Sequence, residues 1–96
     1  MKMVLIAYSE ALDEEVTQVL RVGAATGYTK WTKVLGDGRS SGPHLASNIW
    51  PKANNVLAVA VEDDQVGALL ECVRALRSDI GHEGIKAFVI PLDAVT

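Results

Sequence analysis

Residues 55–76 read NVLAVAVEDDQVGALLECVRAL, and this stretch decides the fold. Its first part, Asn55–Glu62, is rich in Val and Ala and too short for a helix, which predicts a strand. Asp63 and Asp64 follow, where negative charge favours the start of a helix. After them, apolar residues recur at helical spacing, at Val66, Leu69, Leu70, Val73 and Leu76. The stretch therefore predicts a strand followed directly by an amphipathic helix.

The same unit occurs earlier in the chain. A strand is predicted over Met3–Ser9, and the acidic run 13–15 then opens a helix with apolar positions Leu12, Val16, Val19, Leu20 and Gly23, which Gly27 ends. A second strand, Thr29–Leu35, alternates as an edge strand does, with Trp31 and Lys33 on one face. The sequence GHEG (81–84) ends the later helix, and a last strand is predicted over Ile85–Leu92.

This order of elements, βαββαβ, is that of the ferredoxin-like fold, an α+β class. Because crossovers are right-handed, both helices should cover one face of a four-stranded antiparallel sheet. The length of 96 residues suits a single domain, 1–96.

Composition narrows the class of protein. The net charge is −3 and the basic residues are scattered, which argues against nucleic-acid binding. No apolar run is long enough to span a bilayer, so we expect no membrane insertion. The lone cysteine, Cys72, fits a reducing compartment and predicts a cytoplasmic protein.

Two of the predicted strands are apolar on both faces. Residues 3–7 and 56–61 run on without the polar alternation expected of a sheet that is covered on one side only. With no third layer in the chain, a second subunit is the natural cover for the other face. The sequence therefore predicts an oligomer.

Two motifs resemble the P-II superfamily of small trimeric regulators. GDGRSSGPH (36–44) is similar to the Gly-x-Gly-Arg motif that opens the family's T-loop, and IGHEGIKAFVIPLDAV (80–95) is similar to its B-loop and last strand. The loop is shorter here, and Ser40 stands where the family has Gln. The resemblance is therefore to the short P-II-like proteins. It implies a homotrimer that binds a small effector in the clefts between subunits and signals through the T-loop to a protein partner, such as a membrane transporter.

The first motif could bind an anion through backbone N–H groups, hydroxyls and an Arg fork, or could simply turn the chain. It is no Walker loop, because it lacks the Lys and the following helix. With the residues that the resemblance adds from the second motif, the predicted ligand-binding set is Gly36, Asp37, Gly38, Arg39, Ser40, Ser41, Gly81, His82, Glu83, Gly84 and Lys86. The ligand stays open between an adenine nucleotide, bicarbonate or another anion, and a metal ion.

The alternative is a metal-binding or metal-tolerance protein. His44 and His82 could bind Zn or Cu across a subunit boundary, although no Cys-x-x-Cys or His-x-x-x-His chelate is present. No nucleophile–base pair or cofactor fingerprint is recognisable, and we predict that the protein is not an enzyme. The aromatic segment ASNIWPK (46–52) would pack on its own trimer or contact a partner.

Overall fold

The computed structural model describes residues 1–22, 27–38, 42–44, 53–80 and 84–96. The elements are β1 (Lys2–Ser9), the 3-10 turn η1 (Glu10–Leu12), α1 (Asp13–Val22), β2 (Thr29–Val34), β3 (Gly36–Gly38), β4 (Gly42–His44), β5 (Asn54–Val61), the 3-10 turn η2 (Asp63–Gln65), α2 (Val66–Ile80) and β6 (Ile85–Pro91). The predicted order is confirmed, with the short strands β3 and β4 added.

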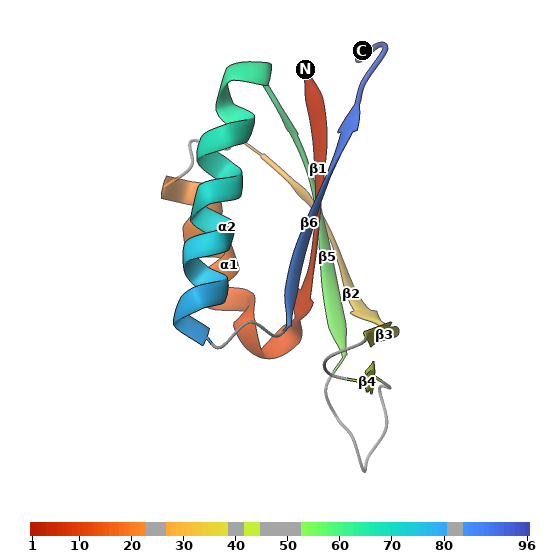
Figure 1. Cartoon of the computed structure of the whole chain (residues 1–96). Coiled ribbons are helices and arrows are strands. Elements are labelled where there is room, and N and C mark those ends of the chain that lie inside the picture. Colours follow the sequence, from red (N-terminus) through yellow and green to blue (C-terminus); the bar gives the residue numbers. More distant parts are fainter. Residues whose placement is uncertain (23–26, 39–41, 45–52, 81–83) are drawn as a thin grey trace.

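Four strands form an antiparallel sheet in the order β2-β5-β1-β6. Figure 1 shows both helices on the same side of this sheet, so the α+β ferredoxin-like architecture is confirmed. The most apolar strands, β1 and β5, lie at its centre, and β2 lies at an edge, as its alternation predicted.

The core lies between the sheet and the helices. Alternate residues of the central strands point into it, and each helix adds one apolar stripe. Fully burying one such side chain contributes about 1.5–3 kcal/mol. The largest fully buried side chains are Tyr8, Ile6, Leu20, Leu57, Leu69, Val4, Val16, Val59 and Val73.

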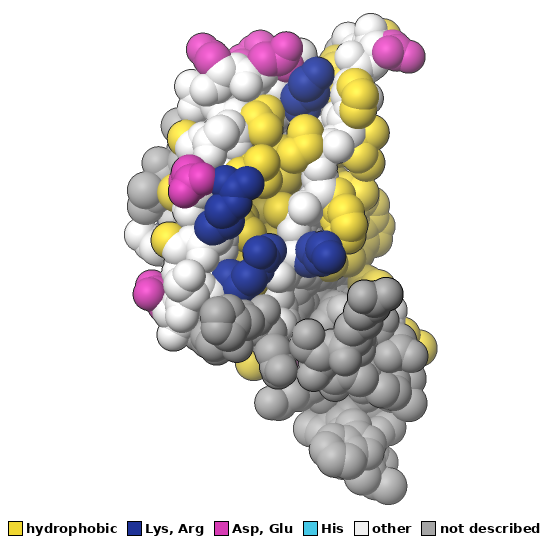
Figure 2. All heavy atoms as spheres, in the orientation of Figure 1, with side chains coloured by type: hydrophobic (Ala, Val, Ile, Leu, Met, Phe, Trp, Pro, Cys, Tyr) yellow, Lys and Arg dark blue, Asp and Glu magenta, His cyan; other side chains and the backbone are white. Residues whose placement is uncertain are grey.

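The opposite face of the sheet carries apolar side chains that no described element of the chain covers. Leu5 pairs in register with Ala58 and Phe88, and Met3 pairs with Ala60 and Ile90. Phe88 is 50 % exposed. Figure 2 shows hydrophobic side chains along the side of the sheet that faces away from the helices.

The structure differs from the sequence prediction at the end of β2. The chain from Gly36 to His44 was expected to be an irregular loop, but β3 pairs with β4 in an antiparallel ladder. Glycines at Gly36, Gly38 and Gly42 lower the steric demands of such a tight pairing.

The expected alternation of β2 is also interrupted. The register with β5 shifts between Trp31 and Val34, and Lys33 has a positive φ of 59°. A β-bulge of this kind changes the direction of the side chains that follow it. Lys33 contacts Glu10, and the regular alternation predicted for Trp31 and Lys33 does not continue through the bulge.

Candidate functional site

The two segments that carry the sequence motifs lie at the same end of the sheet. There β2 leads into β3, β5 begins, and the chain from α2 enters β6 (Figure 1). In register, Ser9 at the end of β1 pairs with Asn54, and Asn54 also pairs with Val34. The residue pairs at this end of the sheet thus connect β2, which leads into the first motif, with the start of β5 and the end of β1.

The dipeptide Ser9–Glu10 connects several segments at this end of the sheet. The Ser9 N–H donates to the carbonyl oxygen of Gly84 at 2.7 Å, and the Glu10 N–H donates to that of Ala53 at 2.9 Å. Backbone N–H groups that are removed from water require hydrogen-bond partners. These two bonds therefore hold the residues that precede β6 and β5 against the end of β1.

The side chain of Glu10 makes a third connection. Its Oε2 accepts a hydrogen bond and ion pair from Lys33 Nζ at 3.2 Å. The Glu10 side chain is 26 % exposed and that of Lys33 is 68 % exposed, so water screens the pair in part. The pair holds the bulge of β2 three residues before Gly36.

Gly36 is in close contact with Asn54. A Cβ atom added at Gly36 would lie 2.5 Å from Asn54 Nδ2. The absence of a side chain therefore lets the base of the β3–β4 hairpin approach the first residue of β5.

The backbone conformation at position 84 favours a glycine. The φ of Gly84 is +84°, a left-handed value that costs a non-glycine residue free energy. The same residue supplies the carbonyl oxygen that Ser9 binds. Lys86, two positions on, is exposed on β6, with its Nζ 6.0 Å from the centre of the Phe88 ring.

The structure places part of the predicted ligand-binding set at this end of the sheet. Backbones of Gly36, Asp37, Gly38 and His44 form the β3–β4 ladder, and Gly84 and Lys86 begin the β6 side. Arg39, Ser40, Ser41, Gly81, His82 and Glu83 lie outside the described residues, as does the aromatic segment 46–52.

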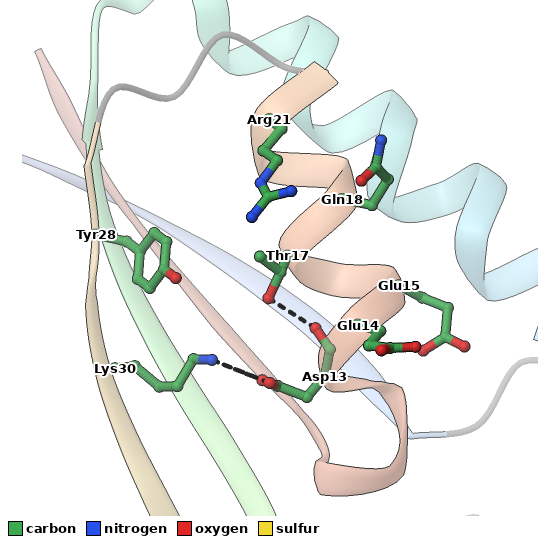
Figure 3. Close-up of a pocket in the computed structure, with 8 residues that line it drawn as sticks. All are labelled: Asp13, Glu14, Glu15, Thr17, Gln18, Arg21, Tyr28 and Lys30. Atoms are coloured by element: carbon green, nitrogen blue, oxygen red, sulfur yellow. Dashed lines mark hydrogen bonds and ion pairs between the residues drawn. The ribbon is translucent and has the colours of Figure 1, made fainter.

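A groove between α1 and β2 was not predicted. It has a volume of about 620 Å³, is open to solvent, and is lined by Asp13, Glu14, Glu15, Thr17, Gln18, Arg21, Tyr28 and Lys30. Figure 3 shows Lys30 reaching across it to Asp13, while Glu14 and Glu15 point away from Tyr28. Lys30 and Asp13 are 17 residues apart, and no local pattern in the sequence indicates their contact.

Asp13, the first residue of α1, is one of the residues that line this groove. Its carboxylate accepts hydrogen bonds from Tyr8 Oη at 2.6 Å, from Asn55 Nδ2 at 3.2 Å and from Lys30 Nζ, which lies 2.9 Å from Oδ1. The hydrogen bonds from Lys30 and Tyr8 lower the pKa of Asp13, and burial raises the pKa of Tyr8. The Asp13 carboxylate is thus satisfied by three donors, while Asn55 Oδ1 is buried with no hydrogen-bond partner among the described residues. We interpret the contacts of Asp13 as a structural network that fastens α1 to the sheet.

The alternative prediction placed a metal ion at His44 and His82. Within the described ranges, no group of three or more His, Cys, Asp and Glu side chains is arranged to hold a metal ion. His82 and the side chain of His44 are outside those ranges. In the part of the chain that the structure describes, no helix is long and apolar enough to cross a membrane.

The whole chain matches a known protein family. A model described as nitrogen regulatory protein P-II matches residues 1–96. A search of the curated proteins finds no match.

Solved structures share the fold. One is CPII, a nitrogen regulatory PII-like protein from Thiomonas intermedia K12, bound to ADP, AMP and bicarbonate: it is 27% identical, covers 93% of this chain and 88% of its own, and has a TM-score of 0.75. Another structure of CPII, bound to ADP and bicarbonate, is 26% identical with a TM-score of 0.74, covering 97% and 88%. A putative PII-like signalling protein from Thermus thermophilus, 23% identical, covers 92% and 81% with a TM-score of 0.63.

Proposed function

The chain belongs to the nitrogen regulatory protein P-II family, and we propose that it is a P-II-like regulator that binds an adenine nucleotide together with a small anion such as bicarbonate. Proteins of this family are regulatory rather than catalytic. The choice of ligand follows the two CPII structures, which hold ADP with bicarbonate and are 26% and 27% identical to this chain.

The observation that carries this proposal is the convergence of the two motif segments. Gly36–Gly38 and Gly84 lie at one end of the sheet, and both are connected to Ser9–Glu10 or to its partner Asn54. In the proposed site, Arg39 and Lys86 supply positive charge for phosphate, and the backbone and hydroxyls of the first motif supply hydrogen bonds. Gly81–Gly84 of the second motif would contact the same ligand.

The proposed site is completed by a neighbouring subunit. P-II proteins are homotrimers, and the uncovered sheet face, with Leu5, Trp31, Phe88 and Ile90, is the surface that we assign to the trimer. Burial of these side chains between subunits would remove from water a patch that a soluble monomer rarely exposes. Phe88→Glu should yield monomers in sedimentation, whereas Ala75→Glu, on the exposed side of α2, should not. A monomeric wild-type chain would contradict the assignment.

Ligand binding would be reported through the β3–β4 hairpin. An anion held by Arg39, Ser40, Ser41 and the Gly36–Gly38 backbone would order the hairpin and change what a partner protein contacts. We propose a cytoplasmic protein and a membrane transporter as that partner, as the family resemblance implies. Co-purification with the membrane proteins encoded beside this chain, with and without ADP, tests the partner.

Calorimetry tests the ligand. The wild-type chain should bind ADP in the presence of bicarbonate, Arg39→Ala and Lys86→Gln should bind it more weakly, and Arg74→Gln, an exposed change on α2, should bind it as the wild type does. Titration with Zn²⁺ or Cu²⁺ tests the alternative, a metal site at His44 and His82. Binding of metal that His82→Ala abolishes, with no binding of nucleotide, would overturn the proposal.

A further inference from the structure

The segments of the proposed site are joined at one point of the chain, the turn from β1 into η1. Ser9 N–H bonds to Gly84, Glu10 N–H bonds to Ala53, and the Glu10 carboxylate pairs with Lys33. Gly84 belongs to the second motif, Lys33 lies three residues before the first motif, and Ala53 immediately precedes β5. None of the three bonds lies inside a helix or in a strand ladder.

We propose that Glu10 is a positioning residue, which holds the two halves of the ligand site in register through its ion pair with Lys33. This inference rests on the proposed function. In the proposed site, Glu10 does not contact the ligand. Its carboxylate restrains the bulge that feeds Gly36, while the backbone of the same dipeptide restrains Gly84 and Ala53.

The strain at Lys33 supports this role. A lysine at φ 59° adopts a conformation that few non-glycine residues occupy, and a compensating contact is needed to hold it. The Glu10 pair is the side-chain contact that Lys33 makes among the described residues. Without it, the bulge should relax, and Gly36 should lose its fixed distance from Gly84.

The Glu10–Lys33 ion pair should therefore increase the affinity for a ligand that binds both segments. If the two halves are already in place, binding does not have to meet the free-energy cost of ordering them. Glu10→Gln and Lys33→Gln should each weaken ADP binding, and since a partly exposed ion pair contributes at most about 1 kcal/mol, the expected loss is about threefold to fivefold.

Calorimetry with ADP and bicarbonate, on the full chain, measures this loss. The double variant Glu10→Gln with Lys33→Gln should bind no more weakly than either single variant, because the two residues act as a pair. The exchanged pair, Glu10→Lys with Lys33→Glu, should recover part of the affinity. Glu71→Gln, which breaks the exposed ion pair with Arg74 on α2, is the matched control and should change nothing.

Amide hydrogen exchange without ligand separates this inference from the proposed function. The amides of Ser9 and Glu10, which bond to Gly84 and Ala53, should exchange faster in both single variants than in the wild type and the control. Unchanged exchange, or losses of affinity that simply add in the double variant, would overturn the role of Glu10. Failure of the wild type to bind ADP would overturn the proposed function instead, and faster exchange would then still establish the connection at Glu10.

Discussion

The hydroxyl of Tyr8, near the end of the central strand β1, donates a 2.6 Å hydrogen bond to Oδ1 of Asp13, the first residue of α1. Tyr8 is 1 % exposed, so its ring packs in the core while its hydroxyl reaches the carboxylate at the edge of the core. The β1–α1 turn that carries Ser9 and Glu10 lies between these two residues. The contact therefore bridges the two ends of the β1–α1 turn, and the proposed site depends on this turn.

Tyr8→Phe should reduce the free energy of unfolding by about 1 kcal/mol, because the phenyl ring keeps the packing and removes only the hydrogen bond. Urea denaturation at pH 7 measures the change. The raised pKa of Tyr8, caused by burial, adds a second expectation: the stability that its neutral form provides is complete below its unfolded pKa of 10.0 and declines as the pH rises beyond it. Tyr8→Phe should therefore show less alkaline destabilisation than the wild type. An equal decline in both proteins would contradict this role.

Asp13→Asn should destabilise the protein at pH 7 by about 1–2 kcal/mol, because a charged acceptor of three hydrogen bonds becomes a neutral amide. The pKa of Asp13 is lowered by the hydrogen bonds from Lys30 and Tyr8. A carboxyl with a lowered pKa stabilises the fold fully above its unfolded value of 3.8, and this contribution is lost as the pH falls through the folded pKa.

Thermal melts between about pH 7 and about pH 2.5 test this dependence. The wild type should lose more of its melting temperature than Asp13→Asn over the acid limb, with Glu71→Gln as the control for an exposed carboxylate. If both proteins lose the same amount, Asp13 does not supply the acid-sensitive stability.

Gly84→Ala should destabilise the fold by about 1–2 kcal/mol, since φ is +84° and an alanine there is strained. The added Cβ would also lie 3.4 Å from Leu12 Cδ1. Gly67→Ala is the matched control, because Gly67 is exposed in α2, has a negative φ, and a Cβ there would meet nothing within 4 Å. That change should stabilise the protein by about 0.5 kcal/mol. Urea denaturation of both variants gives the comparison, and equal effects would refute the conformational argument.

The fold could be predicted from the sequence because its signals are local and periodic. Val66, Leu69 and Val73 repeat at helical spacing and are all at least partly buried in α2. The strand termini agree to within one residue, and the apolar runs of β1 and β5 indicated the uncovered face.

The site was less predictable, for two physical reasons. The contacts of Lys33 with Glu10 and of Lys30 with Asp13 span 23 and 17 residues, so no local pattern reveals them. The contact of Lys33 also involves a bulge that alternation does not predict. The β3–β4 ladder was missed because its residues, three glycines with an Asp, a Pro and a His, include types of low strand propensity and pair at the end of β2.

Gly36→Ala tests the close approach between the hairpin base and β5. The new Cβ would lie 2.5 Å from Asn54 Nδ2, which is the end of a side chain, so the amide should swing aside at a cost of about 1 kcal/mol. In the background of Asn54→Ala the same change should cost less, because the obstructing amide is gone. A double-mutant cycle by urea denaturation measures the coupling between the two positions. Additive effects would mean that Gly36 is needed for its backbone conformation and not for the space that it leaves to Asn54.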